Sequence, residues 1–441
     1  MRVCLLNDSF PPILDGVANA VKNYAAVIQR SYGDVMVATP SFPGAVDQYP
    51  YAVVRYPSID TTKICGYRAG LPLAPEALGT LQKFQPDIIH SHCPVVSTLL
   101  ARTLRSCTDA PIVFTYHTKF DIDIARSFRS GFLQEQAIRL LVANISACNE
   151  VWVVSHGAGE NLRSLGYTGN YQIMENGVDF PLGRVSDQAL ELLQRQYPLP
   201  QDGRPLFLFV GRMMWYKGLR TTLDALAQLK SHGQLFSMVF IGDGADRRKV
   251  EDYARKLGLE ADCLFTGAIH DREVLRSWYC RSNLFLFPST FDTNGIVVRE
   301  AAACSLPSLL IRGSCAAEGI EDGVTGLLME DSPDHMASIL LKFSQDLSAL
   351  RRIGETATEK IYLSWEDSIK RAVERYSIVL DNYHSGRCPA LSDSHEELFH
   401  VTGELLAGLN QSRQFRESIQ HDLFSRTLHT RAHENEEDRY L

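Results

Sequence analysis

The 441-residue chain lacks the long apolar runs and paired cysteines that mark several classes of protein. No stretch approaches the ~20 apolar residues that a membrane-spanning helix needs. The ten cysteines are scattered without a C-x-x-C pair, which argues against a disulfide framework and a zinc signature. The N-terminus predicts a strand and not a signal peptide, because its apolar run is short and ends before Asp8. We therefore expect a cytoplasmic protein, with peripheral contact to the inner face of the cell membrane left open.

The chain also has no basic excess. The formal net charge is −8, whereas a nucleic-acid-binding protein needs a basic face, so we expect no nucleic-acid partner. Residues 1–180 hold 14 Lys+Arg and 15 Asp+Glu, so −1 of the −8 lies there and −7 lies after residue 180. The N-terminal half is therefore the side that an anionic surface or acceptor would approach.

Short apolar runs alternate with amphipathic segments through most of the chain. Strands separated by helices predict parallel sheets joined by crossover helices. Proline and glycine interrupt the pattern between residues 179 and 203, and a single core rarely grows beyond about 250–300 residues. The sequence therefore predicts an α/β fold of two facing doubly wound, Rossmann-like domains. Such domains bind ligands at their strand ends, which here means the cleft between them.

The predicted boundaries divide the chain into four parts. These are a first domain over 1–180, a second over 181–365, a helix over 366–384 that packs back toward the first domain, and a tail over 385–441. The tail contains no lysine, carries a weak apolar stripe and ends in an acidic run. We expect it to be a docking or oligomerisation helix followed by disorder.

Two cations follow the strand predicted at residues 206–210. Arg212 comes almost directly after it, and Lys217 follows five residues later. An Arg fork and a flexible ammonium neutralise phosphate oxygens. Taken alone, an arginine and a lysine in such a loop are more often solvated surface residues without a ligand. We expect both to lie in solvent-accessible loops. Their recurrence with other polar clusters at strand ends favours a ligand site.

Two carboxylates and a glycine turn follow another buried strand of the same half, about seventy residues later. Asp292 and Glu300 flank an Asn-Gly turn where a helix is expected to begin. Backbone N–H groups at Asn294, Gly295 and Ile296 would add a partial positive field for an anion. Gly295 alone could be an ordinary turn glycine. Together with the cations, however, this cluster suits a ligand with a diphosphate and several hydroxyls, such as a sugar nucleotide.

Three histidines stand near strand ends in the first half. His117 follows an apolar strand, and we expect it to line the cleft. We interpret His90 and His92 as pointing to opposite sides of their strand, with His90 buried and His92 in the cleft. Ser155 precedes His156 but lacks a nucleophile elbow, so we expect Ser155 to cap a helix.

These residues resemble the family 4 retaining glycosyltransferases of the GT-B fold. The resemblance covers roughly residues 1–383 in consistent order and leaves the tail outside. In the first half it rests on Phe10-Pro-Pro with Gly16-Val17, Asp87-Ile-Ile-His-Ser-His92, Thr115-Tyr-His117 and Asn176-Gly-Val-Asp179. In the second half it rests on Gly211-Arg212, Lys217-Gly218, Ile241-Gly-Asp-Gly244, Phe265-Thr-Gly267, Pro288-Ser289, Asp292 with Glu300-Ala301, and Asp322-Gly-Val-Thr-Gly-Leu327. It implies an acceptor-side first domain and a nucleotide-sugar-binding second domain.

The resemblance implies a role for each matched residue. Arg212 and Lys217 would hold the diphosphate of a UDP- or GDP-sugar donor and stabilise the departing nucleotide, so no metal ion or other cofactor is expected. Glu300 would bind the ribose hydroxyls. Further implied positions are Gly16 beside the phosphate, Ile269 at the base, His117 beside the reacting sugar, His92 on the acceptor side, and the amides of Asn294, Gly295 and Ile296 along the sugar and diphosphate.

Asp292 departs from the pattern of the family, which usually has Glu at this place to bind a hydroxyl of the donor sugar. Asp is one methylene shorter, so its carboxylate falls about 1.5 Å short unless the loop shifts. We expect this change either to alter which donor hydroxyl is recognised or to weaken activity.

The leading hypothesis is a retaining transferase that moves a hexose from a nucleoside-diphosphate sugar to an acceptor hydroxyl on a lipid or a saccharide. The run Tyr116-His-Thr118 resembles members that act on lipids such as diacylglycerol at the cytoplasmic membrane face. A basic and apolar patch supports this acceptor, formed by Arg126, Phe128, Arg129, Phe132, Leu133, Arg139, Leu140 and Leu141. It could be a membrane-facing amphipathic helix or a core-packed helix with a solvated basic edge.

Two other functions stay open on the same architecture. A sugar-nucleotide 2-epimerase would bind the donor without an acceptor, and a non-catalytic member would bind it without turnover. A nicotinamide dehydrogenase is disfavoured because no G-x-G-x-x-G follows the first strand. The Asp292-x7-Glu300 arrangement favours transfer over epimerisation, and the presence of Arg212, Lys217 and Glu300 favours activity over binding alone.

Overall fold

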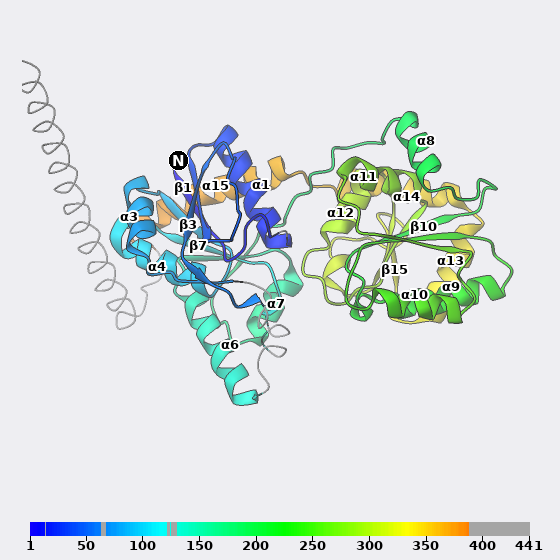
Figure 1. Cartoon of the computed structure of the whole chain (residues 1–441), viewed down its shortest axis with the longest axis horizontal. Helices are drawn as coiled ribbons and strands as arrows, with labels where there is room; N and C mark the ends of the chain where they lie inside the picture. The colour runs from blue at the N-terminus through cyan, green and yellow to red at the C-terminus, as the bar shows by residue number, and fades with distance from the viewer. Residues whose placement is uncertain (14, 63–67, 121–123, 125–129, 388–441) are drawn as a thin grey trace, which may run out of the picture.

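The chain folds into two α/β halves joined by two chain segments (Figure 1). The computed structural model describes residues 1–13, 15–62, 68–120, 124 and 130–387. Each half is built on one parallel sheet, so the predicted fold class is confirmed. The tail beyond residue 387, with the oligomer contact expected of it, lies outside the described residues, as do Arg126, Phe128 and Arg129.

The N-terminal half holds a seven-stranded sheet whose neighbouring strands are all parallel. In spatial order its strands are β3 (Ala52–Tyr56), β2 (Val35–Pro40), β1 (Val3–Leu6), β6 (Ile88–Ser91), β7 (Ile112–Tyr116), β8 (Glu150–Val153) and β9 (Gln172–Ile173). Alternate residues of β1 enter two different cores, with Val3 and Leu5 in one and Cys4 and Leu6 in the other. All four are fully buried, as expected for a parallel strand that is covered on both faces.

Helices connect these strands and cover the sheet. They are α1 (Gly16–Ser31), α3 (Pro75–Phe84), α4 (Val96–Thr108), α6 (Gly131–Ser146) and α7 (His156–Ser164), and a short antiparallel pair is formed by β4 (Ser58–Ile59) and β5 (Ala69–Gly70). The Ser155 side chain accepts a hydrogen bond from the Ala158 backbone N at 3.0 Å and so caps α7. This confirms the prediction of a cap at Ser155.

The C-terminal half holds a six-stranded parallel sheet. In spatial order its strands are β12 (Cys263–Gly267), β11 (Ser237–Ile241), β10 (Leu206–Val210), β13 (Leu284–Phe287), β14 (Ser308–Ile311) and β15 (Leu327–Met329). Its helices are α8 (Asp187–Gln196), α9 (Leu219–Ser231), α10 (Arg247–Lys256), α11 (Arg272–Arg281), α12 (Ile296–Ala303), α13 (Pro333–Ser344) and α14 (Leu347–Lys360).

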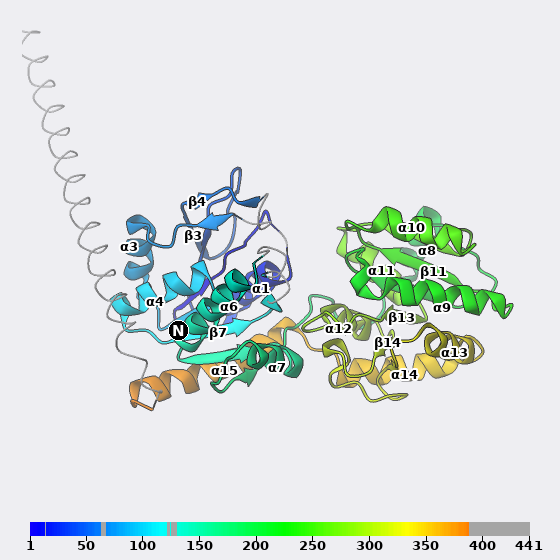
Figure 2. The same cartoon turned by 90° about the horizontal axis from the view of Figure 1, so that it is seen from below.

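Helix α15 (Trp365–His384) follows the C-terminal half in sequence but lies along the N-terminal half (Figure 2). It packs on α1, and its buried residues Trp365, Ile369 and Tyr376 belong to the core that contains Val3 and Leu5 of β1. The Tyr376 hydroxyl lies 2.5 Å from His90 Nδ1 at the end of β6. The chain therefore crosses between the halves twice, and its last described helix completes the first core.

Polar contacts also join the two halves at their facing edges. Thr293 Oγ1 donates to the carbonyl of His117 at 2.7 Å. The Glu318 carboxylate accepts hydrogen bonds from the backbone N–H groups of His156 and Gly157, at 2.7 and 2.6 Å, where α7 begins. The first contact brings the loop after β7 next to the loop after β13, and the other two bring the segment after β14 next to the start of α7.

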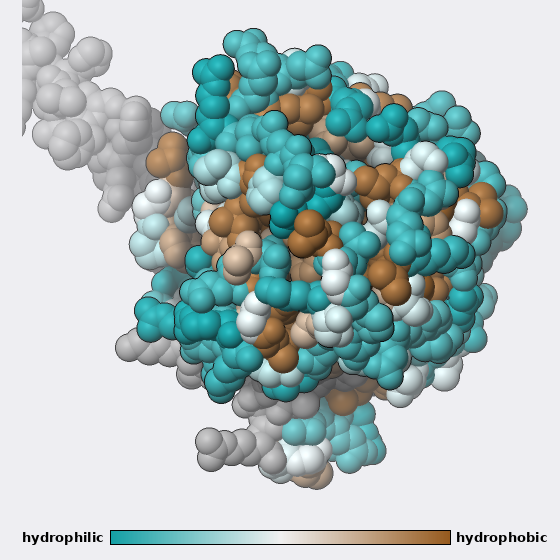
Figure 3. All heavy atoms as spheres, turned by 90° about the vertical axis from the view of Figure 1, so that its right-hand side faces the viewer, coloured by the Kyte–Doolittle hydropathy of each residue, from teal (hydrophilic) through white to brown (hydrophobic). Residues whose placement is uncertain are grey.

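The surface at the far end of the C-terminal half is mixed. Figure 3 shows hydrophobic side chains interspersed with hydrophilic ones on this face, as on most soluble surfaces. In the part of the chain that the structure describes, no helix is both long and apolar enough to span a bilayer.

Candidate active site

The loop after β10 carries Lys217 toward the end of β13. A short 3-10 helix, η1 (Trp215–Lys217), ends at Gly218, whose φ of 75° lies in the left-handed region. A Cβ at Gly218 would stand 2.1 Å from the carbonyl oxygen of Pro288. Only glycine allows this approach, and it fixes Lys217 beside the loop that follows β13.

Lys217 forms an ion pair with Asp292. Its Nζ lies 2.5 Å from Asp292 Oδ1, and 5.5 Å from the ring centroid of Phe287. Lys217 is only 7% exposed, so the prediction of a solvent-accessible loop is wrong for this cation. Arg212 is exposed, as predicted. The two cations therefore differ, since one is held by a carboxylate and the other is open to solvent.

The turn after β13 leaves two buried polar atoms unsatisfied. Asp292 Oδ2 and Asn294 Nδ2 are both buried, and neither has a hydrogen-bond partner among the described residues. Gly295 follows with a φ of 57° and is the N-cap of α12, which begins at Ile296. The helix start predicted here is confirmed, and its first N–H groups lie directly after the two unsatisfied side chains.

Glu300 lies on the buried side of α12, where two side chains from α11 bind its carboxylate. Arg272 donates to Oε1 at 2.8 Å, and the Tyr279 hydroxyl donates to Oε2 at 3.0 Å. Burial raises the pKa of Glu300, and Arg272 and Tyr279 oppose that rise. The guanidinium of Arg272 also lies 4.3 Å from the ring centroid of Phe180. Sequence reasoning missed both Arg272 and Tyr279, because a pairing between two helices leaves no motif in the sequence.

The three histidines form one buried cluster. The ring centroids of His90 and His92 are 3.9 Å apart, so the prediction that they point to opposite sides was wrong. Side chains two residues apart on a strand share a face. His92 Nδ1 lies 2.9 Å from His117 Nε2, which joins the two histidines that were predicted to line the cleft.

Burial sets the charge of this cluster. Desolvation lowers the pKa of His117 to about 3, and it holds the pKa of His92 well below its usual value, with His90 and His117 adding to the effect. Both rings are therefore neutral near pH 7 and can donate or accept hydrogen bonds without carrying charge.

Gly16 and Ile269 lie in the segments that follow β1 and β12. Gly16 is the first residue of α1, after the N-cap Asp15, and a Cβ there would meet no atom within 4 Å. The space beside Gly16 is thus open, as an approaching ligand would need. Ile269 follows β12 and packs partly on the C-terminal core.

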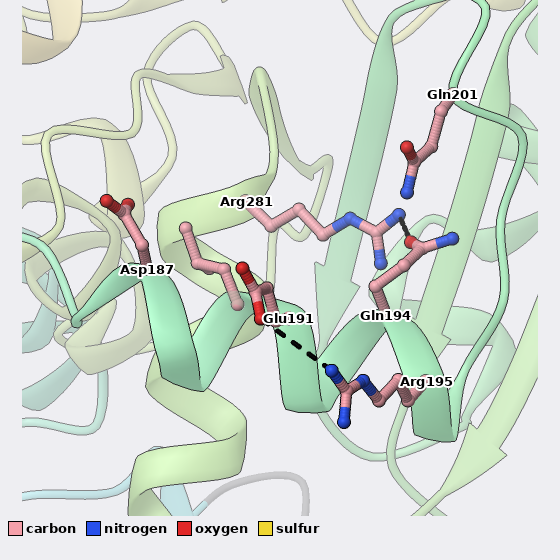
Figure 4. A pocket seen from close by; sticks show the side chains of 7 residues that line it. Asp187, Glu191, Gln194, Arg195, Gln201 and Arg281 are labelled. Carbon is pink, nitrogen blue, oxygen red and sulfur yellow. Dashed lines mark hydrogen bonds and ion pairs between the residues drawn. The ribbon is translucent and has the colours of Figure 1, made fainter.

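A pocket opens near the amino ends of the strands of the C-terminal sheet, at the opposite end from the ion pair (Figure 4). Its lining residues precede β10 and β13 instead of following them: Asp187, Leu190, Glu191, Gln194, Arg195, Gln201 and Arg281. In Figure 4 Arg281 points between Gln194 and Gln201, and it donates to Gln194. Parallel α/β sheets bind ligands at the carboxyl ends of their strands, so we assign the functional site to the Lys217 and Asp292 region. Among the described residues there is no group of three or more His, Cys, Asp or Glu that could hold a metal ion.

Two parallel-sheet halves that face each other across such strand ends define the GT-B architecture. The solved structure of Anabaena HepE in complex with UDP has this fold, with a TM-score of 0.68 and 19% identity over 86% of this chain and 100% of that one. Sucrose-phosphate synthase from Thermosynechococcus elongatus also matches, with a TM-score of 0.68 and 20% identity over 86% of this chain and 99% of that one.

Sequence comparison gives the family. The model for Glycosyltransferase Family 4 matches residues 14–180 and the model for Glycosyl transferases group 1 matches residues 192–360. A GDP-mannose-dependent alpha-mannosyltransferase of Corynebacterium glutamicum is 27% identical over 75% of this chain and 77% of its own length. An alpha-monoglucosyldiacylglycerol synthase of Streptococcus pneumoniae is 22% identical over 87% of each chain. The protein belongs to the family 4 glycosyltransferases of the GT-B fold.

Proposed function

We propose that this protein is a retaining, metal-independent hexosyltransferase that takes its sugar from a nucleoside-diphosphate donor and passes it to a lipid hydroxyl. The observation that carries the proposal is the partly buried ion pair of Lys217 and Asp292 at the carboxyl ends of β10 and β13. The unsatisfied Asp292 Oδ2 beside it needs a hydrogen-bond donor, and a sugar hydroxyl supplies one.

The charges of the site suit a departing diphosphate. When the bond from the anomeric carbon to the diphosphate oxygen breaks, its electron pair leaves with the phosphate and negative charge grows there. Arg212, Lys217 and the first N–H groups of α12 then stabilise that charge. Glu300 holds the ribose, with Arg272 and Tyr279 fixing its carboxylate. His117 is neutral and so contributes a hydrogen bond in place of a charge.

The donor has two candidate bases. The relative from Corynebacterium glutamicum is named for GDP-mannose, and a solved structure of HepE contains UDP-glucose. We therefore propose a UDP- or GDP-hexose, and GDP-mannose and UDP-glucose are the first donors to test. The 2-epimerase alternative predicts an altered nucleotide sugar as the product, whereas transfer predicts free nucleoside diphosphate.

A donor screen tests the proposal. Thermal shift with UDP-glucose, GDP-mannose and related nucleotide sugars should raise the melting temperature with at least one of them, because only the folded state forms the site. That donor should release nucleoside diphosphate in the presence of diacylglycerol vesicles, equally with and without EDTA. NMR of the product should show the anomeric configuration of the donor. Complete loss with EDTA and rescue by Mn²⁺ would contradict metal independence, and an inverted product would contradict retention.

The lipid acceptor is supported by helix α6. It projects from the N-terminal half (Figure 1), and Phe132, Leu133 and Leu140 are all exposed on it. At 3.6 residues per turn these three side chains fall within an arc of about 100°. The only described cation of this stretch, Arg139, is paired with Glu135 at 2.6 Å. The same arc also carries exposed Gln136, and a face with three large exposed apolar side chains fits contact with the interface of a bilayer.

We predict that the double variant Phe132→Ser and Leu140→Ser binds diacylglycerol-containing vesicles about tenfold more weakly or worse, because it removes the apolar area available for insertion. Sedimentation with vesicles measures this. The matched control is Leu192→Ser, since Leu192 on α8 is 57% exposed and Leu140 is 58% exposed. Equal vesicle binding by the double variant, the control and the wild type would contradict a membrane role for α6.

A further inference from the structure

Deepening the proposed function and resting on it, we infer that the side-chain amide of Asn294 determines donor specificity by recognising, together with Asp292, one hydroxyl of the donor sugar. The backbone N–H of Asn294 serves the diphosphate and is a separate group. The side chain is implicated because its Nδ2 is buried without a hydrogen-bond partner among the described residues.

The unsatisfied atoms of this turn are chemically complementary. Asn294 Nδ2 is a donor, and Asp292 Oδ2, two residues earlier, is an acceptor that is equally buried and unsatisfied. A hydroxyl is the common group that donates one hydrogen bond and accepts another at the same oxygen. One sugar hydroxyl can therefore satisfy both side chains, whereas a phosphate oxygen would only accept and would be repelled by the Asp292 carboxylate.

Neighbouring contacts fix the Asp292 side chain and the two residues that flank Asn294. Lys217 holds the other oxygen of Asp292 at 2.5 Å. Between the two side chains, Thr293 is tied to the carbonyl of His117 in the other half at 2.7 Å. Gly295 follows at the N-cap of α12, where a Cβ would stand 3.1 Å from Ala316 Cα. The turn is thus packed on both sides, and such preorganisation is what recognition of a single hydroxyl requires.

This arrangement lowers the stability of the protein when no sugar-nucleotide donor is bound. A buried donor without a partner lowers stability, and replacing it by an apolar group of similar shape removes that cost. Asn294→Leu should therefore keep or raise the melting temperature while it weakens binding of the sugar. A residue with a purely structural role would change stability and binding in the same direction, so the opposed signs identify a recognition residue.

Isothermal titration tests the inference with UDP-glucose, GDP-mannose, their monodeoxy analogues, and free UDP and GDP. We expect Asn294→Leu and Asn294→Ala to bind the donor that the wild type prefers about tenfold more weakly, while binding of its free nucleoside diphosphate stays within about twofold. The loss should vanish with one monodeoxy analogue, because that sugar lacks the hydroxyl in question. Thr290→Ala is the control, since Thr290 is an exposed residue of the same loop.

Three results would overturn the inference. They are an unchanged affinity of both Asn294 variants for the intact donor, an equal loss for the free nucleotide, or a loss that persists with every monodeoxy analogue. If the wild type binds neither donor, the proposed function fails and this inference fails with it. If the wild type binds a donor, Arg212→Ala weakens that binding and the Asn294 variants bind the donor normally, the inference alone fails.

Discussion

Replacing Arg212 or Lys217 with alanine is expected to lower turnover of the sugar nucleotide by about 10²-fold or more. Under the proposed function each cation stabilises the charge that develops on the departing diphosphate, and loss of one such donor from a preorganised site has an effect of this size. Steady-state release of nucleoside diphosphate measures it. The matched controls are Arg248→Ala, an exposed arginine on α10, and Lys230→Ala, a lysine paired with Asp262 at 2.7 Å.

The two variants should differ in stability. Arg212 is exposed, so its removal should leave the free energy of unfolding unchanged. Removal of Lys217 leaves the Asp292 carboxylate without its ion-pair partner, and the Asp292 side chain is only 23% exposed. We expect a loss of about 1–3 kcal/mol, below the cost of breaking a fully buried pair because water reaches this one. Normal turnover in both variants would show that Arg212 and Lys217 do not stabilise the diphosphate.

Glu300→Gln should weaken binding of free UDP or GDP by about 1.5–3 kcal/mol, which is roughly tenfold or more. The variant keeps the shape of the side chain but loses the negative charge that Arg272 and Tyr279 hold in place, and with it the acceptor that we propose for the ribose hydroxyls. Glu273→Gln is the control, because Glu273 lies on the adjacent α11 and faces Arg276 from 3.7 Å in an exposed position. An unchanged nucleotide affinity for Glu300→Gln would show that the ribose does not bind there.

Asp292→Ala, unlike Glu300→Gln, should not weaken binding of the free nucleotide. The two variants therefore separate the roles of the two carboxylates. Removal of the Asp292 carboxylate frees the Lys217 ammonium from the pair at 2.5 Å, so affinity for free nucleoside diphosphate should hold or rise while sugar transfer falls. Equal weakening of nucleotide binding by Asp292→Ala and Glu300→Gln would contradict this division between sugar and ribose.

The sequence predicted those parts of the fold that depend on local pattern. The apolar run 206–210, predicted to be a strand, coincides with β10 (Leu206–Val210). The start of α12 followed from the Asn-Gly turn, because glycine tolerates the left-handed φ of 57° at this N-cap. Short-range periodicity and turn chemistry carry this information.

Contacts between distant segments were not predictable in the same way. The burial of Lys217 depends on Asp292, which lies on another loop. The pairing of Arg272 with Glu300 joins α11 to α12, and Tyr376 of α15 reaches His90 across most of the chain. Each of these pairings is set by tertiary packing, for which a single sequence offers no periodic signal.

A crystal structure with UDP-glucose or GDP-mannose bound tests the central claim most directly, because it locates the donor. The account predicts the diphosphate between Arg212, Lys217 and the N-terminus of α12, the ribose at Glu300, and the sugar at Asp292 and Asn294. A nucleotide bound instead in the pocket beside α8 and α11, or at the strand ends without contact between its diphosphate and either cation, would contradict it.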